Sequence, residues 1–191
     1  MVAMTILGTI SLLLLFWAVG AYKRLSSLRA QCRNAYAMLD AQLKTRHALI
    51  PMIVDRAAGY MEREALDPVN AAREEAVAAS GKNAARLTNA ITMQSIAQVE
   101  NALAIALGRM MAAAEAHADL KTDETMLGLR DALSRAEKDI AFSWQFYNIA
   151  ATQYNLSRSQ FPVSVIAAVF AFRAEALLHM AGEHEAAGLA V

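Results

Sequence analysis

The amino-acid sequence predicts an all-α protein, in which an N-terminal transmembrane helix continues into an antiparallel bundle of about four long helices. Glycine and proline, which interrupt helices, are scarce, with 8 and 3 copies among 191 residues. Apolar residues recur at spacings of three and four, the period of a helix that buries one face. No stretch alternates apolar and polar residues with the period of two that a half-buried strand requires. A chain of this length is sufficient for one domain.

Residues 1–22, MVAMTILGTISLLLLFWAVGAY, contain no charged side chain. About 20 helical residues cross a bilayer core of about 30 Å, so this segment is predicted to be a transmembrane anchor. Trp17 and Tyr22 stand where interfacial aromatic residues are expected, and Lys23 and Arg24 follow them. A cleaved signal peptide is the alternative, but it would have a basic start and a shorter apolar run.

Basic residues are in excess directly after this segment. Seven basic and two acidic residues occupy 23–56, which gives a net charge of +5. Because positive residues stay on the cytoplasmic side, the N-terminus is predicted to lie outside and the bundle in the cytoplasm. Four of these side chains are candidate ligands of anionic lipid headgroups: Lys23, Arg24, Arg29 and Arg33. The alternative is that they form a solvated helix face.

The transmembrane helix is predicted to run without a break into the first helix of the bundle. One apolar stripe follows directly from the anchor: Leu25, Leu28, Cys32, Ala35 or Tyr36, Leu39 and Leu43. Ile50 and Ile53 extend the stripe past Pro51. A proline inside a helix removes one backbone hydrogen bond, so a kink is predicted near residues 47–51.

Two further helices are expected between the first helix of the bundle and residue 117. Asp67 as N-cap and Pro68 at the first helical position predict a helix that runs to about Ser80, followed by a loop at 81–83. A third helix is predicted over about 85–117. Its expected buried residues are Leu87, Ile91, Met93 or Gln94, Ile96 or Ala97, Leu103, Leu107 and Met110 or Met111.

The fourth helix has the clearest pattern and is predicted over about 123–160, with Thr122 as its N-cap. Its apolar ladder consists of Met126, Leu129, Leu133, Ala136, Ile140, Trp144, Tyr147, Ala151 and Tyr154. The spacings alternate between three and four, with one extra step of four at Ile140–Trp144, so coiled-coil-like packing against a neighbour is expected. Pro162 ends this helix.

The C-terminal part is strongly apolar at first and then polar. Residues 163–172 are too few to span a bilayer a second time, so an apolar helix over 163–182 that packs on the bundle or lies at the interface is predicted. The last residues, 183–191, are expected to form a frayed tail.

The pair Tyr-Asn occurs at Tyr147–Asn148 and again seven residues later at Tyr154–Asn155. The tyrosines fall on the buried ladder and the asparagines at its edge. Buried tyrosine hydroxyls need partners, and an interfacial asparagine fixes helix register. The first helix after the anchor is the expected partner, through Tyr36, Asp40, Gln42, Arg46 and His47. The candidate residues for helix register or partner binding are Tyr147, Asn148, Tyr154, Asn155, Asp40, Gln42 and Arg46; structural packing and a protein-binding surface are both possible roles.

Composition and motifs predict no catalytic residue, metal ligand or cofactor. The 18 basic and 18 acidic residues balance, which argues against nucleic-acid binding. Cys32 is the single cysteine, so the chain has no internal disulfide or multi-cysteine zinc site. The signatures His-Glu-x-x-His, P-loop, Gly-x-Ser-x-Gly, Cys-x-x-Cys and the di-iron Glu-x-x-His are absent. Residues 183–185 near His179 could bind a metal weakly, but a solvated tail explains them better.

Two blocks of the sequence resemble the LemA family of bacterial membrane-anchored helical proteins. The first block, residues 21–51, carries Tyr22, Leu25, Leu28-Arg29, Tyr36, Asp40, Gln42-Leu43-Lys44, Arg46 and Leu49-Ile50-Pro51 at family positions. The second, from Glu137 to Phe172, carries the two Tyr-Asn pairs, Phe161-Pro162 and Ile166-Ala167. The resemblance implies a family-type helical bundle over 23–162, tethered to a bacterial cytoplasmic membrane, and supplies no reaction.

The function expected from these observations is a non-enzymatic membrane-anchored scaffold or adaptor that binds another membrane protein. A second possibility is a lipid-interacting or membrane-shaping protein that uses its basic juxtamembrane helix. The sequence leaves the identity of the partner and the oligomeric state open.

Overall fold

The computed structural model describes residues 2–83 and 90–178. Six helices and no strand are present in that part of the chain: α1 (Val2–Ala57), α2 (Arg63–Asn83), α3 (Ala90–Ala114), α4 (Ala118–Thr122), α5 (Glu124–Ser159) and α6 (Val163–Val169). The predicted all-α fold with four long helices is confirmed.

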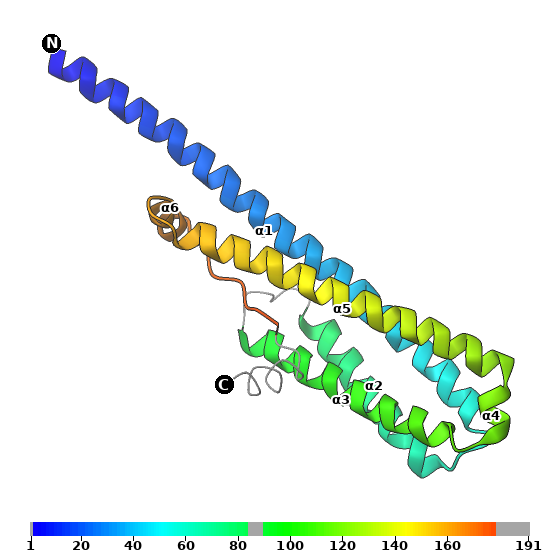
Figure 1. Ribbon diagram of the computed structural model, residues 1–191. Coiled ribbons are helices and arrows are strands. Elements are labelled where there is room, and N and C mark those ends of the chain that lie inside the picture. The colour runs from blue at the N-terminus through cyan, green and yellow to red at the C-terminus, as the bar shows by residue number, and fades with distance from the viewer. Residues whose placement is uncertain (1, 84–89, 179–191) are drawn as a thin grey trace, which may run out of the picture.

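The molecule is elongated because its longest helix runs through most of it (Figure 1). The first part of α1 extends alone, and its large apolar side chains, such as Leu7, Leu13 and Phe16, are exposed. α5 lies antiparallel along the second part of α1, and the α2–α3 hairpin lies beside this pair. Among the described residues, α1 is the one helix long and apolar enough to cross a membrane.

The contact between α1 and α5 forms the core nearest the apolar end of α1. Leu25, Leu39 and Leu43 of α1 are fully buried or nearly so, and they belong to one cluster with Trp144 and Tyr147 of α5. Every residue of the predicted α5 ladder is buried: Met126, Leu129, Leu133, Ala136, Ile140, Trp144, Tyr147, Ala151 and Tyr154. The sequence prediction for this helix is therefore confirmed, because burying that stripe is the main driving force for its packing.

A second core lies at the other end of the bundle, where α1, α2, α3, α4 and α5 meet. α1 contributes Ile50 and Ile53, and the remaining side chains include Leu66 and Val69 of α2, Leu103, Leu107 and Met110 of α3, and Met126 and Leu129 of α5. α1 continues through Pro51, where a kink was predicted, and ends at Ala57. Ile50 and Ile53 are fully buried on either side of the proline, and this packing offsets the missing backbone hydrogen bond.

Two predictions about α2 are wrong. The helix begins at Arg63, so Pro68 lies in its second turn and Asp67 is not the N-cap. The proline is tolerated because its missing hydrogen bond falls on the carbonyl of Glu64 in the first turn, and the earlier start brings Leu66 into the core. The stretch 81–83, expected to be a loop, is the last turn of α2.

The predictions for α3 are partly corrected. The helix ends at Ala114 rather than near residue 117, and Ile91 is exposed rather than buried. The residues expected in its first turn, including Leu87, lie outside the described residues. Met93, Ile96, Leu103, Leu107 and Met110 are buried as predicted.

The N-cap of α5 is Asp123, and Thr122 is instead the last residue of α4. A carboxylate oxygen of Asp123 accepts a hydrogen bond from the backbone nitrogen of Met126 at 2.8 Å and another from Arg56 Nε at 2.8 Å. The Arg56 hydrogen bond and then the Met126 backbone bond lower the pKa of Asp123 to about 2. This carboxylate therefore joins the end of α1 to the start of α5.

The predicted helix over 163–182 is wrong beyond its first two turns. α6 ends at Val169, and Ala171 adopts a φ of 50°, a left-handed conformation that ends the helix and redirects the chain. Residues 172–178 have no regular secondary structure. The rest of the predicted helix and the tail 183–191 lie outside the described residues.

Candidate functional site

The segment Phe172–Leu178, called the C-terminal strap below, runs back along α5. The first part of the strap meets the pair Tyr154–Asn155, and its end meets the pair Tyr147–Asn148, which is nearer the start of α5, so the strap is antiparallel to the helix. The strap descends from α6 beneath α5 (Figure 1). The Tyr-Asn repeat of α5 is the surface that holds it.

Each asparagine of the repeat binds the backbone of one strap residue through two hydrogen bonds. Asn155 Nδ2 donates to the carbonyl of Glu175 at 2.8 Å, and its Oδ1 accepts from the Glu175 nitrogen at 3.0 Å. Asn148 makes the same pair with Leu178, at 2.8 and 2.9 Å. A side-chain amide carries one acceptor and two donors, so it matches a backbone unit that no helix or strand satisfies.

The two tyrosines complete this array. Tyr154 Oη donates to the Arg173 carbonyl at 2.8 Å, and Tyr147 Oη donates to the Ala176 carbonyl at 2.7 Å. Burial raises the pKa of the Tyr147 hydroxyl, which therefore remains a donor. Its ring packs against Tyr36 of α1, with centroids 6.0 Å apart. The prediction that α1 satisfies the polar atoms of the repeat is wrong: α1 covers the rings, and the strap takes the hydrogen bonds.

Side chains of the strap are fixed by α1. The Glu175 side chain is 3% exposed, and its carboxylate lies 3.4 Å from Arg29 Nε. Burial raises the pKa of Glu175, and the nearby Arg29 opposes this shift. Arg29 is thus committed to the strap, whereas the other three lipid-headgroup candidates, Lys23, Arg24 and Arg33, are exposed.

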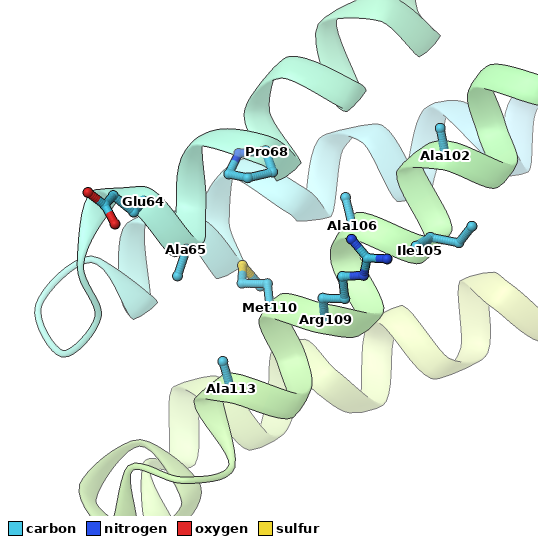
Figure 2. Close-up of a pocket in the computed structure, with 9 residues that line it drawn as sticks. All are labelled: Glu64, Ala65, Pro68, Ala102, Ile105, Ala106, Arg109, Met110 and Ala113. Carbon is cyan, nitrogen blue, oxygen red and sulfur yellow. The ribbon is translucent and has the colours of Figure 1, made fainter.

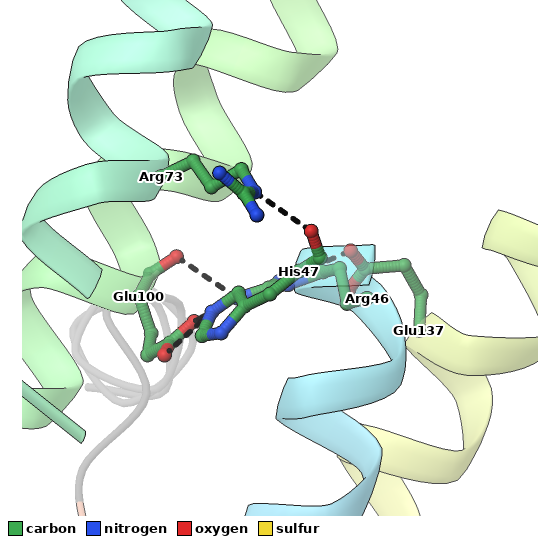
Figure 3. Close-up of polar contacts among 5 residues, drawn as sticks. All are labelled: Arg46, His47, Arg73, Glu100 and Glu137. Carbon is green, nitrogen blue, oxygen red and sulfur yellow. Dashed lines mark hydrogen bonds and ion pairs between the residues drawn. The ribbon is translucent and has the colours of Figure 1, made fainter. Parts of the chain in front are cut away.

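A buried group of charged side chains lies in the last third of α1, around Arg46 and His47 (Figure 3). Arg46 is 3% exposed; its guanidinium donates to Glu137 Oε1 of α5 at 3.0 Å and forms an ion pair with Glu100 of α3. His47 Nε2 lies 3.1 Å from Glu100 Oε1, and Arg73 Nε of α2 donates to the His47 carbonyl at 2.7 Å. The group joins α1, α2, α3 and α5.

Sequence reasoning identified only part of this charged group. Arg46 was a candidate, but its partners Glu100 and Glu137 were not. The signal available was the acidic residue inside an otherwise apolar helix pattern at Glu100. Asp40, another candidate, accepts a hydrogen bond from Lys44 one turn away at 2.5 Å, and Gln42 is half-buried on the same helix.

The surface of the bundle has hollows at the α2–α3 contact and beside the charged group. One, of about 450 Å³, lies between α2 and α3 (Figure 2) and is lined by Glu64, Ala65, Pro68, Ala102, Ile105, Ala106, Arg109, Met110 and Ala113. Most of these side chains are apolar or small. A second hollow, of about 460 Å³, adjoins the charged group and is lined by Asp40, Lys44, His47, Ala48, Arg73, Val77 and Ser80. No cluster of His, Cys, Asp or Glu suited to a metal ion occurs within residues 2–83 and 90–178; His179 and residues 183–185 fall beyond them.

A second apolar stripe runs along α5 on the side facing away from the bundle. It consists of Phe142, Phe146, Ile149 and Leu156, which are 64%, 44%, 56% and 57% exposed. With Gln153 these positions follow spacings of four and three, the pattern of a helix-packing face. The Phe142 and Phe146 rings are stacked, with centroids 6.3 Å apart. This outward stripe was missed because the stronger buried ladder dominates the same sequence.

Replacement of both Asn148 and Asn155 by alanine is expected to release the strap without unfolding α5. Each asparagine contributes two hydrogen bonds of about 1 kcal/mol each, so the Glu175 and Leu178 amides should exchange with solvent about 30-fold faster. Hydrogen exchange of the Asn148→Ala/Asn155→Ala variant measures this change. Gln153→Ala, an exposed position on the same helix, is the control. Unchanged exchange at both strap amides would contradict the role of the two asparagines in holding the strap.

Loss of the Glu100 charge is expected to destabilise the bundle strongly. Glu100→Gln leaves the buried Arg46 without its main counter-charge, which lowers the free energy of unfolding by about 3 kcal/mol. The matched control is Glu137→Gln, because that carboxylate also binds Arg46 but is 39% exposed. The control should cost less than about 1 kcal/mol. Equal losses in chemical denaturation would show that burial does not set the strength of these pairs.

Comparison with known proteins identifies the family of this chain. A search of curated proteins finds no match to this chain. The family model for the LemA family matches residues 35–189, which is most of the chain and includes α5 with its Tyr-Asn repeat and the strap. This chain belongs to the LemA family.

Proposed function

We propose that this protein is a non-enzymatic, membrane-anchored helical scaffold that binds a helix of another membrane protein. The observation that carries the proposal is the outward stripe of α5, formed by Phe142, Phe146, Ile149 and Leu156. The opposite face of α5 packs on α1. α5 therefore has one apolar face inside the bundle and one apolar face exposed outside it. A contiguous exposed apolar face of this kind marks an interaction surface.

The spacing of the stripe suits a helical partner. Positions 142, 146, 149, 153 and 156 follow the four-three alternation that lets two helices interlock side chains. The two stacked phenylalanines provide large, rigid anchors, and aromatic residues are enriched among energetically dominant contacts. Gln153 is the one polar position in the series, and a single polar residue in a packing seam favours one register.

The position of the stripe favours a partner that is itself in the membrane. Phe172, at the start of the strap, lies beside the ring of Tyr22 where the uncharged segment of α1 ends, with centroids 5.6 Å apart. Leu156 is three residues before the end of α5 at Ser159, the end of the helix that is followed by α6 (Figure 1). A helix that leaves the bilayer next to α1 could therefore run directly along the stripe.

The anchor and the bundle are rigidly connected in this proposal. α1 is one helix from Val2 to Ala57, so no hinge separates its apolar first part from the part that packs on α5. We place the protein in the bacterial cytoplasmic membrane with the N-terminus outside and the bundle in the cytoplasm. The net charge of +5 over residues 23–56 supports that orientation.

Photo-crosslinking in native membranes tests the scaffold function. A photoreactive amino acid at Phe146 or Ile149 is expected to capture one discrete membrane protein, and Phe142→Gln in the same chain should abolish the product. Glu75, exposed on α2, is the control position and should give no such product. Products no different from those of the control would contradict partner binding by the stripe. A product consisting only of two copies of this chain would make the stripe a self-association surface instead.

The exposed basic residues after the anchor favour a second candidate function, binding of anionic lipid. Lys23, Arg24 and Arg33 are all exposed on α1, and each basic residue near an anionic surface contributes about 1 kcal/mol. The protein in mixed vesicles should associate preferentially with spin-labelled anionic lipid rather than zwitterionic lipid. The preference should fall at high salt and disappear in Lys23→Gln/Arg24→Gln/Arg33→Gln. Equal association with both lipids would argue against this function.

A further inference from the structure

α6 lies at the end of the bundle where α1 leaves its uncharged segment. The Tyr22 ring, at the end of that segment, contacts Phe170 and Phe172 with centroids 4.9 and 5.6 Å apart. α1 and α6 also pack against each other. Figure 1 shows α6 beside the part of α1 that emerges from the bundle. These contacts fix the depth of α6 relative to the apolar part of α1.

The two faces of α6 have different surroundings. Ile166 and Ala167 are buried against the bundle. On the opposite face Val165, Ala168 and Val169, which are three and four residues apart, are exposed, and Val169 is 71% exposed. Two exposed phenylalanines flank the helix in the sequence: Phe161, which is 84% exposed, precedes it, and Phe170, which is 56% exposed, follows it. Ser164 is the one side chain with a polar group between Phe161 and Phe172.

We propose that this outer face of α6 inserts into the headgroup and acyl-chain boundary of the membrane that α1 crosses. The bilayer is the occupant because the face continues the apolar surface of α1 at the level of Tyr22, an aromatic residue of the type that lies at membrane interfaces. Seven helical residues are too few to span a bilayer, but they suffice to lie in its interface.

The charge distribution around α6 fits this placement. Lys23 and Arg24 on α1 and Arg173 after α6 are exposed. They follow the apolar segments directly in the sequence, as interfacial basic residues do when their charges remain among lipid headgroups. The apolar face and its basic border together resemble the two sides of an interfacial amphipathic segment.

Insertion of α6 would give the bundle two contacts with one membrane. α1 alone allows the bundle to rotate about the helix axis, whereas a second contact beside α1 limits that rotation. The direction of the outward stripe of α5 relative to the membrane plane would then be set. This inference rests on membrane anchorage by α1 and is independent of partner binding by the stripe.

Spin-label accessibility in the full-length protein tests the proposal. The protein with Cys32→Ala is reconstituted into phosphatidylcholine vesicles and labelled at one introduced cysteine, Phe161→Cys or Val169→Cys. Oxygen concentrates in the hydrocarbon region and a nickel chelate remains in water, so the ratio of their collision rates reports depth. Leu13→Cys on the apolar part of α1 is the membrane control. Phe142→Cys, equally apolar and 64% exposed, is the aqueous control.

Labels at Phe161 and Val169 are expected to give ratios between those of the two controls, with at least a threefold lower nickel accessibility than at Phe142. A nickel accessibility equal to that at Phe142 in both variants would overturn the insertion of α6. If Leu13 also behaves as a water-exposed position, the anchor itself fails, and the proposed membrane function fails with it. The four labelled positions therefore separate failure of α6 insertion from failure of the anchor.

Discussion

The antiparallel contact between α5 and the second part of α1 is the interaction on which the other parts of the structure depend. Leu25, Leu39 and Leu43 are buried to 1% exposure or less, and each such side chain contributes about 1.5–3 kcal/mol. The α2–α3 hairpin, the strap and α6 all pack against this pair or its ends. Because α1 is also the apolar helix that leaves the bundle, the same helix carries both the core and the candidate membrane anchor.

Polar contacts then determine how the remaining segments are placed on that pair. Arg46 binds Glu100 and Glu137 from two other helices. Removal of the charge of the buried Glu100 is costly, so this pair specifies which faces of α1 and α3 meet. The Tyr-Asn repeat does the same for the strap by binding the strap's backbone groups, and the side chains of Phe172 and Leu178 are buried in the core between α1 and α5. The charge of Glu175 against Arg29 adds one side-chain requirement.

Two exposed apolar surfaces of the described part of the chain carry the proposed roles besides that of α1: the outward stripe of α5 and the outer face of α6. The outward stripe of α5 has helix-packing spacing along its length, whereas the outer face of α6 is short and lies level with Tyr22. Length and position therefore separate their proposed roles: a partner helix matches the first, and a lipid boundary matches the second. Both roles depend on the unbroken course of α1, which holds the bundle in one relation to its anchor.

The sequence by itself determined the helical class, the apolar segment 1–22 and the buried ladder of α5, because the periodicity of apolar residues is local and each helix must bury one face. It also indicated that Tyr147, Asn148, Tyr154 and Asn155 act together. Only the tertiary structure decided what they meet. The Ala-Glu-Ala-Leu-Leu stretch at 174–178 favours a helix by propensity, yet the Asn148 and Asn155 amides hold its backbone outside any helix. Likewise the partners of Arg46 lie 54 and 91 residues away, a separation at which spacing along the chain carries no information about contact.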